Sequence, residues 1–477
     1  MKLFSYIHKK CPSNPIRVWL LGFLLSGCNV GPDYVPPKVN MPASYKEISD
    51  QWKIAEPCDE IDRGEWWKVF GDERLNSLME KLNIFNQDIA VAKAQYRQAI
   101  ALIGQASSAY APQINGSVSL SKQSSVTTPS NQKSSAVTNA TASASVSWDP
   151  DLWGAVSHTV AANEANAEAS CAQLALVKLS MQASMAQYYF QLCALDNLQK
   201  ILDNNVESYG KLLKITEDRY NVGVSSVLNI VTVKSQLEAA EVIAIDNGVL
   251  RAQYEHAIAV LIGMPVCEFS ITPQQVDLIP PSIPIYLPSD LLERRPDIAQ
   301  AERQMAAENE QIGVVTAAFF PTFSLGASKG IAATSLGQLL SAPVYIWSLG
   351  PQLAANFFDG GLLRSEKEEA IAKYDQSVAS YRKTTLVAFQ DVEDNLVSLR
   401  LLDTEVKKQN EAVISAQTQL QLVKDEYISG TAALSDVITA QINAYATQNM
   451  LNAIEGRRMV ASVGLIKALG GGWGGVA

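Results

Sequence analysis

Apolar and polar positions along this chain predict long helices and a few short strands. Residues 154–223 and 361–430 contain no proline and are rich in Ala, Gln, Glu, Leu and Lys. At 1.5 Å per residue, each stretch predicts a helix of about 100 Å. Residues 223–265 and 75–112 also have a helical composition, and their lengths sum to nearly one long helix. The simplest packing therefore places two short helices end to end beside one long helix.

The pattern changes to a period of two in two places, and each place predicts a β-hairpin. The predicted strands are residues 114–120, 142–148, 322–327 and 345–349. A Ser/Thr/Asn-rich loop from about 121 to 140 joins the first pair, and a loop that contains Gly330 and Pro343 joins the second. Pro112 and Pro321 end the helix before each hairpin. After the first 27 residues no apolar run reaches the length of a transmembrane helix, so any insertion into a membrane must use strands.

This order of elements occurs twice because the chain contains an internal duplication. Residues 88–93 recur at 297–302, about 209 positions later, and residues 220–223 recur at 427–430, about 207 positions later. Solenoid repeats are 20 to 50 residues long, so this period indicates two fused copies of one long unit. The smallest transmembrane barrels need about eight strands, so the four predicted here require partner subunits to close a barrel.

The N-terminus predicts a secretory signal peptide, residues 1–27, that is removed. Basic residues precede a short apolar run, which is too short to span a bilayer. Ser26-Gly27-Cys28 follows and is similar to a lipobox, so Cys28 is the predicted lipidated first residue of the mature chain. The alternative is an ordinary signal peptide before an incidental Cys. An Asp directly after the lipidated Cys would resemble a signal that keeps a lipoprotein in the inner membrane. This chain has Asn29 there, and the absence of an Asp favours the outer membrane.

Charge and candidate chemistry exclude several functions. The signal peptide carries four positive and no negative side chains, so the net charge of −10 becomes −14 in the mature chain, which disfavours nucleic-acid binding. Four further cysteines lack metal-type spacing and imply no disulfide framework: Cys58, Cys171, Cys193 and Cys267. After the signal peptide the only histidines are His158 and His256, and the sequence has no phosphate-binding glycine loop. Neither an enzyme nor a cofactor is expected.

Three motifs resemble the TolC-like outer-membrane efflux lipoproteins of the NodT type. They are NVGPDY at 29–34, WWKVFGD at 66–72, and LPSDLLERRPDI at 287–298 with Ala301-Glu302-Arg303 behind it. The resemblance runs from Cys28 to about Lys467. It implies a mixed α and β membrane protein, in which a homotrimer forms a 12-stranded β-barrel from four strands per protomer. A long periplasmic α-helical barrel continues the β-barrel.

The resemblance also implies a division of the chain into six parts. They are a signal peptide (1–27), a lipidated extended segment (28–70), a first efflux-protein repeat (71–267), a linker (268–287), a second repeat (288–469) and a Gly-rich tail (470–477).

The function implied by the resemblance is an exit duct of a tripartite efflux pump, lipid-anchored in the outer membrane. Small molecules would pass from an inner-membrane RND-type transporter through a periplasmic adaptor to the exterior. A duct for type I protein secretion is an alternative, although the Arg294-Arg295-Pro296-Asp297 motif with lipidation resembles the small-molecule branch more closely. A pore-less periplasmic coiled-coil lipoprotein is a further alternative, and the paired hairpins argue against it.

In this family the adaptor docks at the turns between long and short helices. The matching residues are Val222, Gly223, Val224, Ser429, Gly430 and Thr431. Glycine suits such a turn because it adopts φ > 0 without cost, and a helix-ending role alone is the alternative. Ser429 departs from the commoner Val-Gly pattern of the first copy.

A tunnel constriction is the second implied site. Asp436 falls where the family often has an acid near the narrowest part of the closed tunnel, and three copies on a threefold axis would concentrate negative charge. Asn229 takes its place in the first copy. Tyr427, with Arg219 of the other copy, is expected to help hold the tunnel shut. A surface carboxylate beside a turn is the alternative for Asp436.

Overall fold

The structure is a computed structural model that describes residues 30–36, 64–124, 136–281 and 294–471. Cys28, Cys58 and most of the third motif lie outside the described residues. The chain forms two compact units, which we describe separately. Among the described residues, the strand unit comprises 30–36, 97–124, 136–169 and 302–380, and the helix unit comprises 64–96, 170–281, 294–301 and 381–471.

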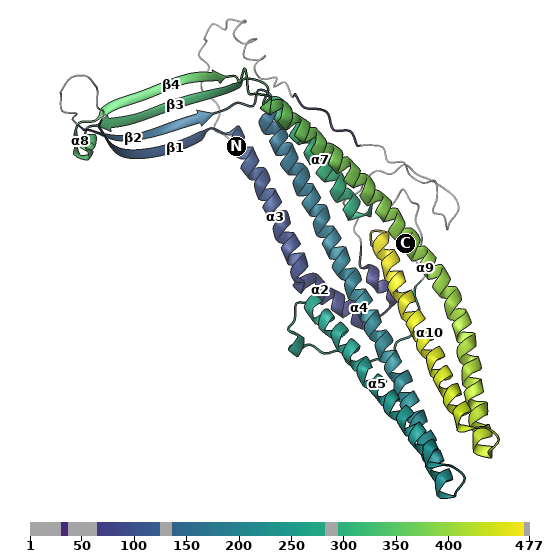
Figure 1. The fold of residues 1–477 in the computed structure, drawn as a ribbon. Coiled ribbons are helices and arrows are strands. Elements are labelled where there is room, and N and C mark those ends of the chain that lie inside the picture. Colours follow the sequence, from purple (N-terminus) through teal and green to yellow (C-terminus); the bar gives the residue numbers. More distant parts are fainter. Residues whose placement is uncertain (1–29, 37–63, 125–135, 282–293, 472–477) are drawn as a thin grey trace, which may run out of the picture. The chain divides into compact units, whose positions relative to one another are not determined.

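The strand unit contains one antiparallel sheet in the order β1-β2-β3-β4 (Figure 1). Its strands are β1 (Gln113–Gln123), β2 (Val137–Trp148), β3 (Thr322–Ala333) and β4 (Val344–Ala354). Both predicted hairpins are present, and β2 pairs with β3 to join them.

The predicted hairpin ends need correction. All four strands are longer than expected, and the first loop is correspondingly shorter than 121–140. Gly330 lies inside β3, opposite Ser143 and Ile346, rather than in a loop. The connection from β3 to β4 holds a short helix, α8 (Leu336–Ser341), that was not predicted. The reason is that alternating Ser, Ala and Gly give a weak strand signal, while their backbones pair as well as any others.

The register of the four strands gives the sheet two chemically different faces. Hydroxyl side chains meet across one face, where the oxygens of Ser117 and Ser143 are 3.0 Å apart and those of Ser328 and Ser348 are 2.8 Å apart. We call this the polar face. The residues between them point the other way because side chains alternate along a strand. This apolar face carries Ile114, Val118, Leu120, Val146, Ile331, Tyr345, Trp347 and Leu349.

The helices match the predicted long and short stretches, with one exception. They are α2 (Glu73–Phe85), α3 (Gln87–Ser107), α4 (Ala155–Asn221), α5 (Val227–Leu261), α7 (Pro296–Ala317), α9 (Leu362–Ser429) and α10 (Leu434–Ala468), with 3₁₀ turns η1 (Trp66–Phe70), η2 (Ser108–Tyr110) and η3 (Val266–Glu268). The two long helices, α4 and α9, span 67 and 68 residues, which confirms them. The predicted helix at 75–112 is wrong in one respect, because it breaks at Asn86. The Asn86 backbone leaves the helical region, and its side chain accepts the Ile89 N–H at 2.9 Å to begin α3.

The end-to-end stacking of short helices is confirmed at two equivalent junctions in the helix unit. In the first copy, the Asn86 side chain donates to the carbonyl oxygen of Leu261, the last residue of α5, at 2.8 Å. In the second copy, Arg295 donates to the carbonyl oxygen of Ala468, the last residue of α10, at 3.1 Å. Arg295 stands 209 positions after Asn86, and Ala468 stands 207 positions after Leu261. The duplication therefore preserved the junction, although the donor side chains differ.

The second of the three motifs builds part of the core of the helix unit. Trp66 and Trp67 are buried. Asp72 accepts the Leu75 N–H at 2.9 Å and so caps α2. Its other carboxylate oxygen accepts the hydroxyl of buried Tyr189 at 2.6 Å. Burial, together with the nearby Asp72 carboxylate, raises the pKa of Tyr189, so the phenol stays protonated as the donor.

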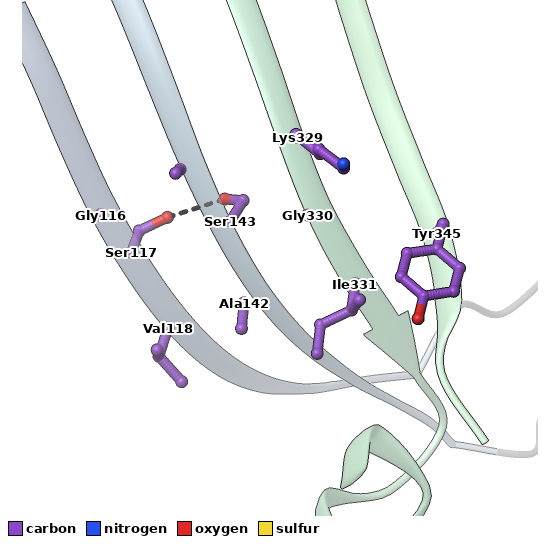
Figure 2. Close-up of a pocket in the computed structure, with 10 residues that line it drawn as sticks. Gly116, Ser117, Val118, Ala142, Ser143, Lys329, Gly330, Ile331 and Tyr345 are labelled. Atoms are coloured by element: carbon purple, nitrogen blue, oxygen red, sulfur yellow. Dashed lines mark hydrogen bonds between the residues drawn. The ribbon is translucent and has the colours of Figure 1, made fainter. Parts of the chain in front are cut away.

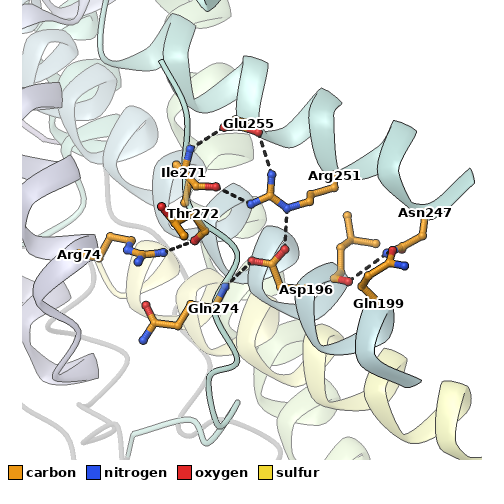
Figure 3. Close-up of polar contacts among 10 residues, drawn as sticks. Arg74, Asp196, Gln199, Asn247, Arg251, Glu255, Ile271, Thr272 and Gln274 are labelled. Atoms are coloured by element: carbon orange, nitrogen blue, oxygen red, sulfur yellow. Dashed lines mark hydrogen bonds and ion pairs between the residues drawn. The ribbon is translucent and has the colours of Figure 1, made fainter. Parts of the chain in front are cut away.

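A buried polar network holds the segment after α5 against α4 (Figure 3). Arg251 donates to Asp196 at 2.6 Å, to Glu255 at 2.8 Å and to the Ile271 carbonyl oxygen at 2.6 Å. The two carboxylates in turn accept backbone N–H groups from Gln274 and Ile271. The network therefore fixes the start of the region between the two copies.

Candidate functional site at the helical turns

Two turns in the helix unit connect a long helix to a short one. The first tip is residues 222–226, between α4 and α5, and the second tip is residues 429–433, from the last residue of α9 to the residue before α10. Gly223 has φ +78° and Gly430 has φ +85°. In both tips the glycine N–H returns to the third carbonyl behind it, and the next N–H returns to the fifth. This pair of hydrogen bonds is the Schellman motif, which ends a helix and requires a residue in the left-handed region.

The two tips begin their short helices with different halves of a capping box. In the first tip, the Ser226 hydroxyl accepts the Asn229 N–H at 3.4 Å. Ala433 occupies the equivalent place in the second tip and has no acceptor. There the Asp436 carboxylate accepts the Ala433 N–H at 3.2 Å. A carboxylate in the first turn also interacts favourably with the helix dipole, so Asp436 has a capping role within its own chain.

Arg219 and Tyr427, predicted together at the constriction, do meet in the structure. The guanidinium carbon of Arg219 lies 4.5 Å from the centre of the Tyr427 ring, and Arg219 also donates to the Tyr427 carbonyl oxygen. The Tyr427 ring is buried in a cluster with Leu212, Val233 and Val437. Its hydroxyl has no partner among the described residues. The contact joins the two copies of the duplicated unit at the base of the tips.

The two tips present different surfaces. Around the first tip five apolar side chains are exposed, with Val222 at 74% and Leu228 at 73%: Val222, Val224, Val227, Leu228 and Val231. At the second tip, Ile428 is the only exposed large apolar side chain among the described residues. Ser429 and Thr431 each donate to the Glu426 carbonyl oxygen at 3.0 Å. The group of exposed apolar side chains around the first tip is typical of a protein contact surface.

A polar cluster near the tips was not predicted. Lys424, one turn before Tyr427, donates to the Ser208 hydroxyl at 2.7 Å, and that hydroxyl donates to Gln441 at 3.0 Å. Gln441 also donates to Asn205 at 2.8 Å. No carboxylate in the described part of the chain pairs with Lys424, and burial lowers the pKa of its ammonium. Contacts between residues more than 200 positions apart leave no local signal in a sequence.

The first of the three motifs packs against α7 in the strand unit. Tyr34 donates to Glu302 at 2.5 Å, and Asn309 donates to the Pro32 carbonyl oxygen at 3.0 Å. Burial and the Glu302 carboxylate raise the pKa of Tyr34. His158, on α4, lies 2.6 Å from Glu310, and its ring fits closely against Gly313, where an added Cβ would clash. These contacts hold residues 30–36, which directly follow the region of Cys28.

Further features of the described residues concern metal sites, free cysteines and membrane-spanning helices. Across the described ranges, no group of three or more His, Cys, Asp or Glu side chains is placed to hold a metal ion. Cys171, Cys193 and Cys267 are free thiols. No helix in the described part of the chain is both long and apolar enough to cross a membrane.

Comparison with known proteins identifies the family. The sequence profile of the outer membrane efflux proteins matches residues 78–264 and 287–471. The chain belongs to the outer membrane efflux protein family. The family member OpmQ of Pseudomonas aeruginosa, a pyoverdine export outer membrane protein, is 31% identical to this chain and matches 94% of it and 95% of its own length.

Other members of the family extend this result. The probable efflux pump outer membrane protein TtgC of Pseudomonas putida is 29% identical over 94% of each chain. Among solved structures, the outer-membrane channel OprN superposes with a TM-score of 0.81 at 26% identity, covering 94% of this chain and all of that one. These relatives are outer-membrane channels and pump components rather than enzymes, so the predicted family and an outer-membrane efflux role are confirmed.

Proposed function

We propose that this chain is the outer-membrane exit duct of a tripartite efflux pump, and that it works as a homotrimer. The observation that carries the proposal is the four-stranded sheet, which has a polar and an apolar face. In the described chain β1 and β4 each pair on one side only, and every residue of β1 is exposed. Three such sheets joined edge to edge would close a 12-stranded barrel with a polar lumen, which satisfies the backbone groups of the edge strands.

The long helices support the periplasmic half of this proposal. Helices α4 and α9 are far longer than a globular core requires and end in tips that expose apolar or hydroxyl side chains. We assign Val222, Gly223, Val224, Ser429, Gly430 and Thr431 to adaptor docking. We assign Asp436, Tyr427 and Arg219 to the tunnel constriction, with the Arg219–Tyr427 contact stabilising the closed state. Cys28 carries the lipid anchor.

The transported class is small molecules delivered by an RND-type transporter through the adaptor. Relatives are named for pyoverdine export, for efflux pumps and, in Escherichia coli, for cation efflux by CusC. These names support small-molecule efflux over protein secretion, and transporter and adaptor genes beside this one would separate the two.

Gly430 offers the sharpest test of docking. A deletion strain first identifies a compound to which the host becomes sensitive, and variants are then compared for restoring resistance. We expect Gly430→Val to lose resistance yet reach the outer membrane as an intact trimer, because an added Cβ at Gly430 meets nothing within 4 Å.

Two controls separate bulk at the tip from backbone strain. Gly430→Asn adds a side chain that tolerates φ > 0, so it should also impair efflux. Gly71 has φ +67° and equally open space away from the tips, so Gly71→Val should restore resistance. Normal efflux by Gly430→Val would refute docking at this glycine, and loss of the trimer would favour a helix-ending role alone.

A further inference from the structure

The charges of the two hairpins differ from those of the rest of the chain. The whole chain has a net charge of −10, yet residues 112–148 and 321–354 contain no Asp or Glu. Their charged side chains are Lys122, Lys133 and Lys329. Lys133 lies outside the described residues. The hairpins are therefore a purely cationic part of an acidic protein.

The two described lysines lie on the apolar face of the sheet. Lys329 pairs across the strands with Ala144 and Trp347, and Lys122 lies at the loop end of β1 opposite Thr138. Both side chains are exposed, and neither forms an ion pair with any described residue. The polar face has no charged side chain on any of the four strands. The cations thus stand on the face that, in the proposed barrel, contacts lipid.

Lys329 lies on the apolar face level with Trp347 across the strands, on the loop side of the sheet. Ile331 and Ala333 continue the same face beyond it towards the loop, and Ala327 and Leu325 precede it. The four steps along the strand from residue 329 to residue 333 span about 13 Å. A charged side chain on the lipid face is unfavourable in a depth-dependent way, and a long Lys reaches towards the interface to find a polar partner. No carboxylate on either hairpin can serve as that partner.

A shallow hollow lies beside Lys329 (Figure 2). It has a volume of about 410 Å³, and most of its lining residues belong to the apolar face, among them Gly116, Ala142, Ala144, Lys329, Ile331 and Tyr345. Figure 2 shows Lys329, Ile331, Val118 and Tyr345 as the long side chains around the small ones. The hollow has the shape and surface to take an acyl chain, with a cation at its margin.

We propose that this hollow and Lys329 bind an anionic phospholipid, with an acyl chain in the hollow and the phosphate at the Lys329 ammonium. Lys122, nearer the loop, adds a second positive charge to the same face. The proposal rests on the proposed function, because it requires the apolar face to contact a membrane. Charge complementarity selects the occupant: an unpaired cation on an acid-free apolar surface fits an anionic lipid and not a zwitterionic one.

The test uses the full-length protein in nanodiscs of phosphatidylcholine with a minor fraction of phosphatidylglycerol that has the same acyl chains. Native mass spectrometry of the released protein then counts each lipid retained. We expect phosphatidylglycerol to be enriched on the wild type, and Lys329→Gln to reduce its affinity about five-fold. Lys329→Arg should retain the enrichment. Lys407→Gln removes an exposed charge on α9, where Lys407 pairs with Asp403, and should change nothing.

Each failure has a separate meaning. Failure to enter nanodiscs would refute the proposed membrane function itself. Normal insertion with equal retention of both lipids, or full enrichment in Lys329→Gln, would refute the lipid site alone. Displacement of phosphatidylglycerol by free glycerol phosphate would show that the cation binds a headgroup without the hollow, which also overturns the proposal. Equal thermal stability of Lys329→Gln and wild type excludes misfolding as the cause of a loss.

Discussion

Replacing Arg251 with Met should loosen the segment that follows α5 without unfolding the helices. Arg251 makes ion pairs with Asp196 and Glu255 and a hydrogen bond to the Ile271 carbonyl oxygen, as Figure 3 shows. Met is about as long as the aliphatic stem of Arg and keeps the apolar contacts of that stem. The substitution therefore removes the charge and leaves both carboxylates in place without their cation.

The size of the effect follows from burial. The side chain of Asp196 is 3% exposed and that of Arg251 is 17% exposed, so neither is well solvated. Removing one partner of a buried ion pair costs about 3 to 5 kcal/mol, and the partial exposure of Arg251 favours the lower end. About 3 kcal/mol corresponds to roughly a hundred-fold change in a local opening equilibrium.

Hydrogen exchange measures this opening directly. The amides of Ile271 and Gln274 donate to Glu255 and Asp196, so their exchange reports on the network. We expect both amides to exchange roughly a hundred-fold faster in Arg251→Met. Lys211→Met is the control, because Lys211 pairs with Glu207 on the same helix, α4, with both side chains mostly exposed. It should leave these amides unchanged.

Two results would refute the reasoning. Unchanged exchange at Ile271 and Gln274 in Arg251→Met would mean that the network contributes little. Failure of a second substitution, Asp196→Leu, to restore part of the protection in the Arg251→Met background would mean that the unpaired buried charge is not the source of the loss.

Three further predictions concern anchoring, topology and the polar cluster. Mass spectrometry should find an acylated Cys28 at the mature N-terminus, and Cys28→Ser should lack the lipid; an unmodified wild-type cysteine contradicts this. Ser130→Cys in intact cells should react with an impermeant thiol reagent, since the first loop is predicted to face outside and Trp148, Tyr345 and Trp347 to lie near the membrane interfaces. Lys424→Met should raise the melting temperature at pH 7, because burial of an ammonium with only a hydroxyl partner lowers its pKa and destabilises the charged form. That gain should shrink as pH rises through 10.5, the usual Lys pKa, since the wild-type lysine is then neutral in both states; a lower melting temperature at pH 7 would instead indicate an acidic partner for Lys424.

The sequence predicted the long helices of this fold well, and it predicted the strands and the helix break only in part. The absence of proline over nearly 70 positions predicted α4 and α9 almost to their ends. The strands were underestimated because Ser and Ala alternate with little contrast in hydrophobicity. The break at Asn86 did carry a signal, an Asn before Gln87-Asp88 that matches a helix N-cap, but the continuous helical composition on both sides concealed it.

In the candidate site, too, residues with a local sequence signal were predicted, and contacts made only by tertiary packing were not. Both tip glycines were placed correctly at the helix ends because a Gly between helical stretches has a direct backbone meaning. The Arg219–Tyr427 contact followed only from resemblance and the duplication. Nothing local predicted that Lys424 would find Ser208, since the chain reaches that contact only after α4 and α9 pack together.

The duplication explains why the two tips share a backbone but not a surface. Each Schellman turn needs only one glycine, so the positions around it were free to diverge once the unit was copied. Where the first copy begins its short helix with the Ser226 hydroxyl, the second uses the Asp436 carboxylate, and either is sufficient to cap a helix. The exposed side chains at the turn contribute little to the fold, and there the copies differ, with Val224 in one and Thr431 in the other. In the proposed trimer, apolar and hydroxyl-bearing tips would therefore alternate around the ring, and a partner that contacts all six must bind two different surfaces.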